Sequence, residues 1–271
     1  MMTTRTNKTV SRLILAVLLL AGLSTWKIQA QERRVQAQDS TQPAQKIDPK
    51  VRALMEKVQR AYRQPSYLSF RVKYLYANEG QPATGMDSLA GEMEMDKNRC
   101  RFVIDGMETV LTDKYAIQIM NEDRAIYLSA GRHAAVSNPV SMLDSVLAHI
   151  DGVQTDLRQQ GQSEVLTFRF PAGSPYSMVR IQVDTRTGYF QKISYSLFTT
   201  GLVAQELIDR PGHPGPYQSR GQIDIVFSRY EQGRFGDALF KEENFFNKTG
   251  GRFEPAGRYK DYHIFLASSN L

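Results

Sequence analysis

The sequence predicts a mainly β, α+β fold, in which an antiparallel sheet is covered by two or three helices. Apolar residues recur at helical spacing up to Tyr62 and then alternate with polar residues from Tyr67 onward. Successive alternating segments are joined by short turns, as in an antiparallel meander. Because such a sheet has one apolar face that must be covered, amphipathic helices are expected to pack on it.

Residues 1–30 have the three parts of a secretory signal peptide. Three basic residues precede an apolar run at residues 13–23, which is too short to span a membrane comfortably. Ala30 or Ala37 provides the small residue expected at the cleavage site. We therefore expect export to the periplasm and no membrane-spanning segment after cleavage. An uncleaved N-terminal anchor is the alternative.

The net charge of +6 suggests a nucleic-acid partner, but most of it belongs to this leader. Of 34 basic and 28 acidic residues, four basic and no acidic ones lie in residues 1–30, which leaves a net charge of +2 elsewhere. Arg99 and Arg101 alternate outward on one predicted strand, but no basic stripe extends from them. We therefore expect no nucleic-acid binding.

A flexible linker and a helix are predicted to follow the leader. Residues 31–47 are polar, rich in Gln and without a period, which is typical of a linker. A single domain is then predicted for residues 48–271. It begins with Asp48-Pro49, an N-cap and first-turn proline, followed by apolar residues at helical spacing. This pattern predicts an amphipathic helix with one buried face, ended at Gln64-Pro65.

Strands are predicted wherever apolar and polar residues alternate. They occupy residues 67–76, 89–96, 99–104, 115–120, 125–129, 163–170, 178–183, 189–197, 222–230 and 259–267. Asn138-Pro139 opens a second predicted helix, which extends to Ile150. The segment at residues 198–221 is rich in Pro and Gly and longer than a meander connection needs. It is either a lid over a cavity or a solvated excursion.

The residues that carry most enzyme chemistry form no recognisable pattern. The four histidines have no metal-ligand spacing, and there is no P-loop, CxxC pair or G-x-S-x-G turn. The one cysteine, Cys100, alternates in step with Phe102 and Ile104, which predicts a buried apolar role rather than a nucleophile. We expect no enzyme, metal or cofactor. A hydrolase using Ser or His would need polar groups that converge only on folding.

Methionine is the remaining signal, because eight of the ten methionines lie beyond the leader, mostly on predicted strands. Methionine is flexible and polarisable, so it suits surfaces that accommodate variable apolar guests. An ordinary core packed under the helices explains the same composition. Both interpretations stay open at this point.

Several stretches, in this order along the chain, resemble one known family. They are SYLSFRV at residues 66–72 after the amphipathic helix, GEMEM at 91–95, the basic and polar turn at 96–99, VLTDKYAIQIM at 110–120, and the helix at 139–150. They are similar to the corresponding parts of the periplasmic lipoprotein carrier LolA and its relatives. The resemblance covers about residues 50–150.

This resemblance implies a curved antiparallel sheet that forms an incomplete barrel, with helices on its open side and an apolar cavity between them. Each acyl CH₂ buried there contributes about 0.8 kcal/mol, so chains are held without polar specificity. Ten residues are expected to line this cavity. They are Phe70, Val72, Tyr74, Met93, Met95, Phe102, Ile117 and Ile119 on the strands, and Leu143 and Leu147 on the second helix.

The expected function is an exported carrier of lipid or lipoprotein, whose partners are acyl chains and envelope proteins that donate or accept the cargo. The alternative is a non-enzymatic envelope interaction or scaffold module that has the same fold with a filled core. A continuous apolar void between sheet and helices would favour the carrier.

Overall fold

The computed structural model describes residues 48–271 apart from 82–85, 97–98, 132–151, 175, 234–236 and 269–270. The described chain is mainly β, as predicted, and contains a single α-helix, α2 (Pro49–Arg63). The predicted leader, the linker and the second helix, with Leu143 and Leu147, lie outside the described residues.

The strands follow in chain order from α2. They are β1 (Tyr67–Asn78), β2 (Asp87–Asp96), β3 (Arg99–Ile104), β4 (Met107–Leu111), β5 (Tyr115–Met120), β6 (Ala125–Ala130), β7 (Gln154–Gln160), β8 (Ser163–Arg169), β9 (Tyr176–Asp184), β10 (Phe190–Phe198), β11 (Arg220–Gln232), β12 (Phe246–Thr249), β13 (Arg252–Pro255) and β14 (His263–Leu266). Short 3-10 helices lie between some of them. They are η2 (Thr199–Gly201), η3 (Gln205–Leu207), η4 (Asp237–Phe240), η5 (Glu242–Asn244) and η6 (Gly257–Tyr259).

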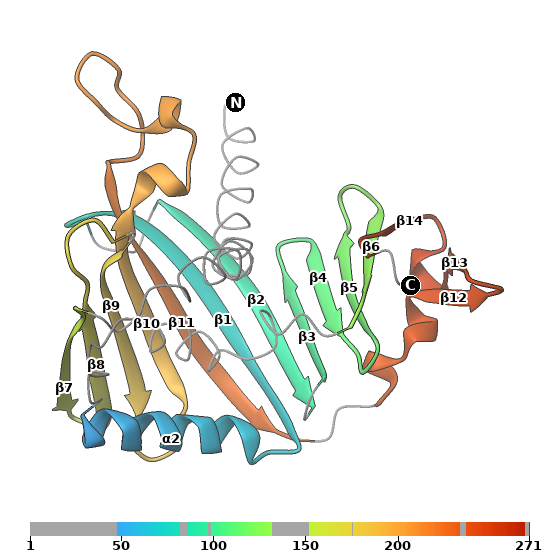
Figure 1. Cartoon of the computed structure of the whole chain (residues 1–271), viewed down its shortest axis with the longest axis horizontal. Coiled ribbons are helices and arrows are strands. Elements are labelled where there is room, and N and C mark those ends of the chain that lie inside the picture. Colours follow the sequence, from blue (N-terminus) through green and yellow to red (C-terminus); the bar gives the residue numbers. More distant parts are fainter. Residues whose placement is uncertain are drawn as a thin grey trace, which may run out of the picture. The chain divides into compact units, whose positions relative to one another are not determined.

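The twelve strands of the main sheet are hydrogen-bonded in the order β14-β6-β5-β4-β3-β2-β1-β11-β10-β9-β8-β7 (Figure 1). The predicted meander is present from β1 to β6, and its hairpins are antiparallel. Two features are new relative to the sequence prediction: β11 lies next to β1, and β14 pairs in parallel with β6. This sheet therefore contains strands from the beginning and from the end of the described chain.

The chain divides into two compact units that share strands β1, β2 and β11. Unit 1 contains residues up to Ala61, Lys73–Leu89 and Asn138–Val226, and unit 2 contains Tyr62–Val72, Ala90–Ser137 and Phe227–Leu271. The single domain predicted for residues 48–271 stays a prediction.

In unit 1, α2 packs against the sheet through the face that its periodicity predicts. The helix begins where the Asp48 side chain accepts a hydrogen bond from the Lys50 amide (2.8 Å). Its apolar stripe, which includes Leu54 and Val58, is buried. The Lys57 ammonium lies 3.0 Å from the Glu164 carboxylate on β8. Figure 1 shows α2 lying across one end of the strands of this unit.

The segment at residues 198–221, expected to be a lid or an excursion, is anchored to the end of β1 in unit 1. The Tyr76 hydroxyl lies 3.1 Å from the Thr199 hydroxyl, and the Tyr217 hydroxyl donates to the Asp87 carboxylate (2.9 Å). Asn78 donates from its side-chain amide to the Pro216 carbonyl (3.2 Å). The base of the segment is therefore fixed, while its tip at residues 210–214 is exposed.

Candidate functional site

One face of the sheet in unit 2 carries most of the residues predicted to contact a ligand. Met93 is paired with Phe102, and Met95 with Cys100, so these side chains share a face. The Arg71 guanidinium donates to Glu92 (3.0 Å) on the opposite face. Because neighbouring residues of a strand point to opposite faces, Phe70 and Val72 lie on the side of Met93. We call Phe70, Val72, Met93, Met95 and Phe102 the methionine face.

Tyr74 continues the alternation of Phe70 and Val72 along β1, in the part of that strand that belongs to unit 1. Its side chain is buried, as are the five residues of the methionine face. These six predicted residues are therefore buried and alternate in step on their strands.

The structure does not bring Ile117 and Ile119 together with these six. Phe102 is paired with Thr109, which is in turn paired with Gln118, so these three side chains share the methionine face. Ile117 and Ile119 flank Gln118 on β5 and therefore point to the opposite face. They belong to a cluster covered by the chain's own last segment. This C-terminal cluster consists of Val110, Ile117, Ile119, Ile126, Leu128, Phe240, Phe245, Phe246 and Tyr259.

Aromatic rings hold this C-terminal cover in place. Phe245 stacks on Tyr259 with 5.7 Å between ring centroids, and Phe246 meets Tyr115 edge to face at 5.3 Å. Sequence reasoning missed this cover and expected a strand at residues 259–267, whereas Tyr259 belongs to η6 and only His263–Leu266 form a strand. The high density of Phe and Tyr after residue 239 was the available signal.

The two faces differ in how much water-accessible surface some of their side chains keep. Met93 and Met95 each keep 7% of their surface accessible to water, whereas Ile117, Ile119 and Ile126 keep 0%. The isoleucines of the C-terminal cluster are therefore fully buried under the cluster's aromatic residues. The methionine face combines flexible side chains with residual accessible surface, which is typical of an adaptable apolar site.

Cys100 lies on the side of the methionine face and is buried, as predicted. Burial raises the pKa of its thiol to about 12, and the hydrogen bond with the Leu111 backbone lowers it only in part. The thiol therefore stays protonated at neutral pH. Since the thiolate is the nucleophilic form, Cys100 acts here as a small apolar residue.

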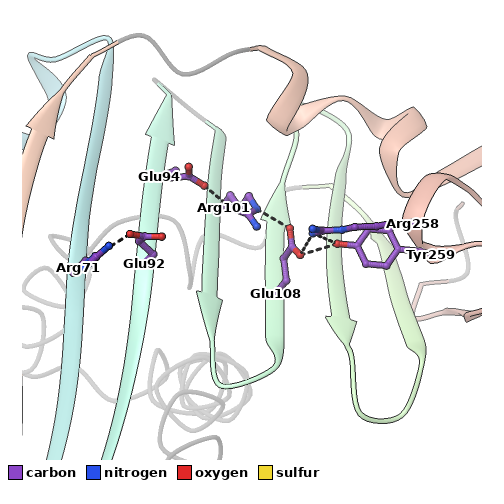
Figure 2. Close-up of polar contacts among 7 residues, drawn as sticks. All are labelled: Arg71, Glu92, Glu94, Arg101, Glu108, Arg258 and Tyr259. Carbon is purple, nitrogen blue, oxygen red and sulfur yellow. Dashed lines mark hydrogen bonds and ion pairs between the residues drawn. The ribbon is translucent and has the colours of Figure 1, made fainter.

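The opposite face of β1 to β4 carries a row of ion pairs between arginines and carboxylates (Figure 2). Arg101 lies between Glu94 (2.7 Å) and Glu108 (2.6 Å). We call this the arginine face. Its arginines are neutralised by carboxylates on neighbouring strands.

Glu108 links the arginine face to the C-terminal cover. Its carboxylate, almost fully buried, accepts hydrogen bonds from Arg101 (2.6 Å), Arg258 (2.6 Å) and the Tyr259 hydroxyl (2.7 Å). Burial, followed by the bond to this carboxylate, raises the pKa of Tyr259, so the phenol remains a donor. These contacts hold η6 against β4 (Figure 2).

Two kinds of site are not found in the described part of the chain. Its His, Cys, Asp and Glu residues form no group of three that could hold a metal ion. None of its helices combines the length and the apolar character needed to cross a membrane.

No protein-family model matches the chain, and no curated protein matches it either. Solved structures similar to it include an uncharacterised conserved protein from Thermus thermophilus, at 8% identity and a TM-score of 0.44, covering 80% of this chain and 99% of that one. A LolA superfamily protein from Nitrosomonas europaea matches at 9% identity and a TM-score of 0.34, covering 72% and 98%. The lipoprotein LppX from Mycobacterium tuberculosis matches at 15% identity and a TM-score of 0.37, covering 70% and 100%.

One of these structures is described as a member of the LolA superfamily, the family that parts of the sequence resemble. Their TM-scores are all below 0.5, so they carry no conclusion on what this chain binds.

Proposed function

We propose that this chain is an exported periplasmic carrier that binds the acyl chains of a lipid or lipoprotein on the methionine face. In this proposal the sheet is the wall of an incomplete barrel, and Phe70, Val72, Met93, Met95 and Phe102 contact the cargo. The leader at residues 1–30 directs export.

The observation that carries this proposal is the contrast between the two faces of unit 2. The C-terminal cluster contains the chain's own aromatic residues and keeps no accessible surface on its isoleucines. Met93, Met95 and Met107 on the other side each keep 7%. Since each acyl CH₂ buried contributes about 0.8 kcal/mol, even one chain of ordinary length gives useful affinity without polar contacts.

Co-purified lipid is the first expected result. The chain, exported with its own leader and purified without detergent, should release acyl lipids when it is extracted with organic solvent and analysed by mass spectrometry. The lipid-free protein should then bind a fluorescent fatty acid, whose emission rises in an apolar site. Trp26 in the leader is the only tryptophan, so loss of tryptophan emission verifies that the leader has been removed.

A folded sample that yields no lipid and leaves the fatty-acid emission unchanged would contradict the carrier. That result would favour the alternative, an envelope interaction or scaffold module with a filled core. Circular dichroism of the same sample establishes that it is folded.

A further inference from the structure

Strand β14 of unit 2 is the last strand of the sheet, so only one of its two edges is paired (Figure 1). It runs parallel to β6, and its His263 amide donates to the Arg124 carbonyl (2.8 Å). Because the amides of a strand point to its two edges in turn, those of Ile264 and Leu266 face away from β6. No residue that the structure describes accepts a hydrogen bond from either amide. We call residues 264–266 on this side the outer edge of β14.

The side chains at this edge are large, apolar and exposed. Phe265 is 49% exposed and Leu266 is 55% exposed. Phe265 stacks on Tyr127 of β6, itself 41% exposed, with 5.3 Å between ring centroids. Since neighbouring residues of a strand point to opposite faces, Phe265 and Leu266 leave one apolar side chain uncovered on each face. Unpaired backbone groups flanked by apolar side chains form a template for a further strand.

The strand at the other end of the strand order, β7 of unit 1, is protected against such pairing. Its Arg158 and Asp156 side chains form an ion pair (2.8 Å), and that of Arg158 is 70% exposed. Every residue of β7 is described, and none of its large apolar side chains is exposed. Charged side chains on an edge strand oppose the addition of another strand. β14, with the sequence HIFL, has no acidic residue, lysine, arginine or proline.

The size of the patch favours a short segment over a second copy of this chain. Tyr127, Phe265 and Leu266 together expose about 300 Å², since each is about half exposed and a large aromatic side chain covers about 150–250 Å². A stable protein–protein interface needs about 800 Å² on each partner. One added strand gains its affinity from main-chain hydrogen bonds as well, so a smaller apolar area is sufficient.

The linker of this chain does not have the composition that this edge selects. Residues 31–47 contain two large aliphatic side chains, Val35 and Ile47, and a proline at position 43. A strand that covers both Phe265 and Leu266 needs apolar side chains close together on its two faces. Proline also interrupts the row of backbone donors that pairing requires. The occupant therefore comes from another protein.

We propose that the outer edge of β14 binds an extended, largely uncharged segment of a partner protein, which joins the sheet as a further strand. The Ile264 and Leu266 amides donate to carbonyls of this segment, and its apolar side chains cover Phe265 on one face and Leu266 on the other. This site goes beyond the proposed function and does not depend on it.

The position of this edge relative to the methionine face gives the docking a use in cargo transfer. Phe102, Thr109, Gln118 and Tyr127 are paired in turn across β3 to β6, so they form one row on the side of the methionine face. Tyr127 is paired with Phe265, which ends this row at the edge. A partner strand docked on β14 therefore lies beside the same face that is proposed to hold acyl chains.

The test uses a fluorescein-labelled peptide of alternating threonine and valine with a lysine at each end, titrated with the lipid-free chain. Fluorescence anisotropy should show saturable binding. The same peptide N-methylated at every threonine and valine keeps its side chains but has no donors there, and should bind at least about tenfold more weakly. With the unmethylated peptide at about ten times its dissociation constant, amide exchange at Ile264 and Leu266 should slow about tenfold.

Two variants of the chain test the two parts of the edge. Leu266→Pro removes an outward amide that β6 does not use, so the sheet is kept and peptide affinity should fall at least about 3- to 10-fold, the equivalent of one net hydrogen bond. Phe265→Ala removes the exposed ring and should lower the affinity by a similar factor. Phe198→Ala, at a ring of unit 1 that is 41% exposed, is the matched control and should bind as the unaltered chain does.

Several results would overturn the proposal. They are absence of peptide binding, equal binding of the N-methylated peptide, unchanged exchange at Ile264 and Leu266 in the complex, and equal affinities for Phe265→Ala and Phe198→Ala. A concentration-dependent dimer of the unaltered chain that is lost in Leu266→Pro would instead assign the edge to a second copy. Because the peptide assay contains no lipid, none of these outcomes bears on the carrier, which is tested by its own lipid-binding experiments.

Discussion

Replacing Phe246 with alanine is expected to lower the free energy of unfolding by about 3–5 kcal/mol, the cost of removing a large aromatic side chain from a packed core. Phe246 is 3% exposed and lies in the C-terminal cluster. Its ring meets Tyr115 at 5.3 Å and Phe253 at 5.4 Å between centroids. The ring therefore covers β5, the strand that carries Ile117 and Ile119. Urea unfolding followed by circular dichroism measures the loss.

Phe265→Ala provides the matched control for this change. Phe265 is 49% exposed and stacks on Tyr127, with 5.3 Å between ring centroids. Because the Phe265 ring buries little apolar surface, its removal should lower the free energy of unfolding by less than about 1 kcal/mol. Equal losses for the two variants would show that the C-terminal segment does not form the cover of this face.

Glu108→Gln is expected to lower the free energy of unfolding by about 2–3 kcal/mol. The substitution removes the charge that holds Arg101 and Arg258 but keeps the shape of the side chain. The Glu108 side chain is only 4% exposed, so solvent compensates little of this loss. Arg101 keeps Glu94 as a partner (2.7 Å), which limits the effect. The unfolding midpoint in urea measures it.

Glu92→Gln is the control on the same face. Glu92 pairs with Arg71 at 3.0 Å, but both side chains are about half exposed. Exposed ion pairs contribute between about 0 and 1 kcal/mol. A loss for Glu92→Gln as large as that for Glu108→Gln would mean that burial does not set the strength of these pairs.

The elements with strong local signals were predicted correctly from the sequence. Asp48-Pro49 and the spacing of Leu54 and Val58 placed α2, and alternation placed Phe70 and Met93 on buried faces. The sequence did not predict which residues of neighbouring strands share a face of the sheet. The five residues of β4 were not recognised as a strand, so the parity of β5 relative to β3 was unknown. A shift of one residue exchanges the faces of a strand, which is why Ile117 and Ile119 were assigned to the cavity.

Pairing between strands that are far apart in the chain was not predicted from the sequence either. The contact of β11 with β1 joins segments far apart in the chain, and no local turn indicates it.

A pair of enlarging substitutions tests directly whether the methionine face holds a ligand, as proposed, or is a filled core. Val72→Phe enlarges a residue on that face, and Val103→Phe makes the same change on the arginine face, where Val103 is paired with Glu108. The measurement is the affinity for the fluorescent fatty acid, taken together with the free energy of unfolding of each lipid-free variant.

A face with room for acyl chains accommodates the added ring, so Val72→Phe should weaken fatty-acid binding about tenfold or more with little loss of stability. Val103→Phe should leave the affinity unchanged. An overpacked core instead loses about 1–3 kcal/mol when a side chain is enlarged. The carrier would be contradicted if Val72→Phe lowered the free energy of unfolding by that amount and both variants bound the fatty acid equally well. The same loss of stability would also contradict it if the fatty acid bound neither to the unaltered chain nor to either variant.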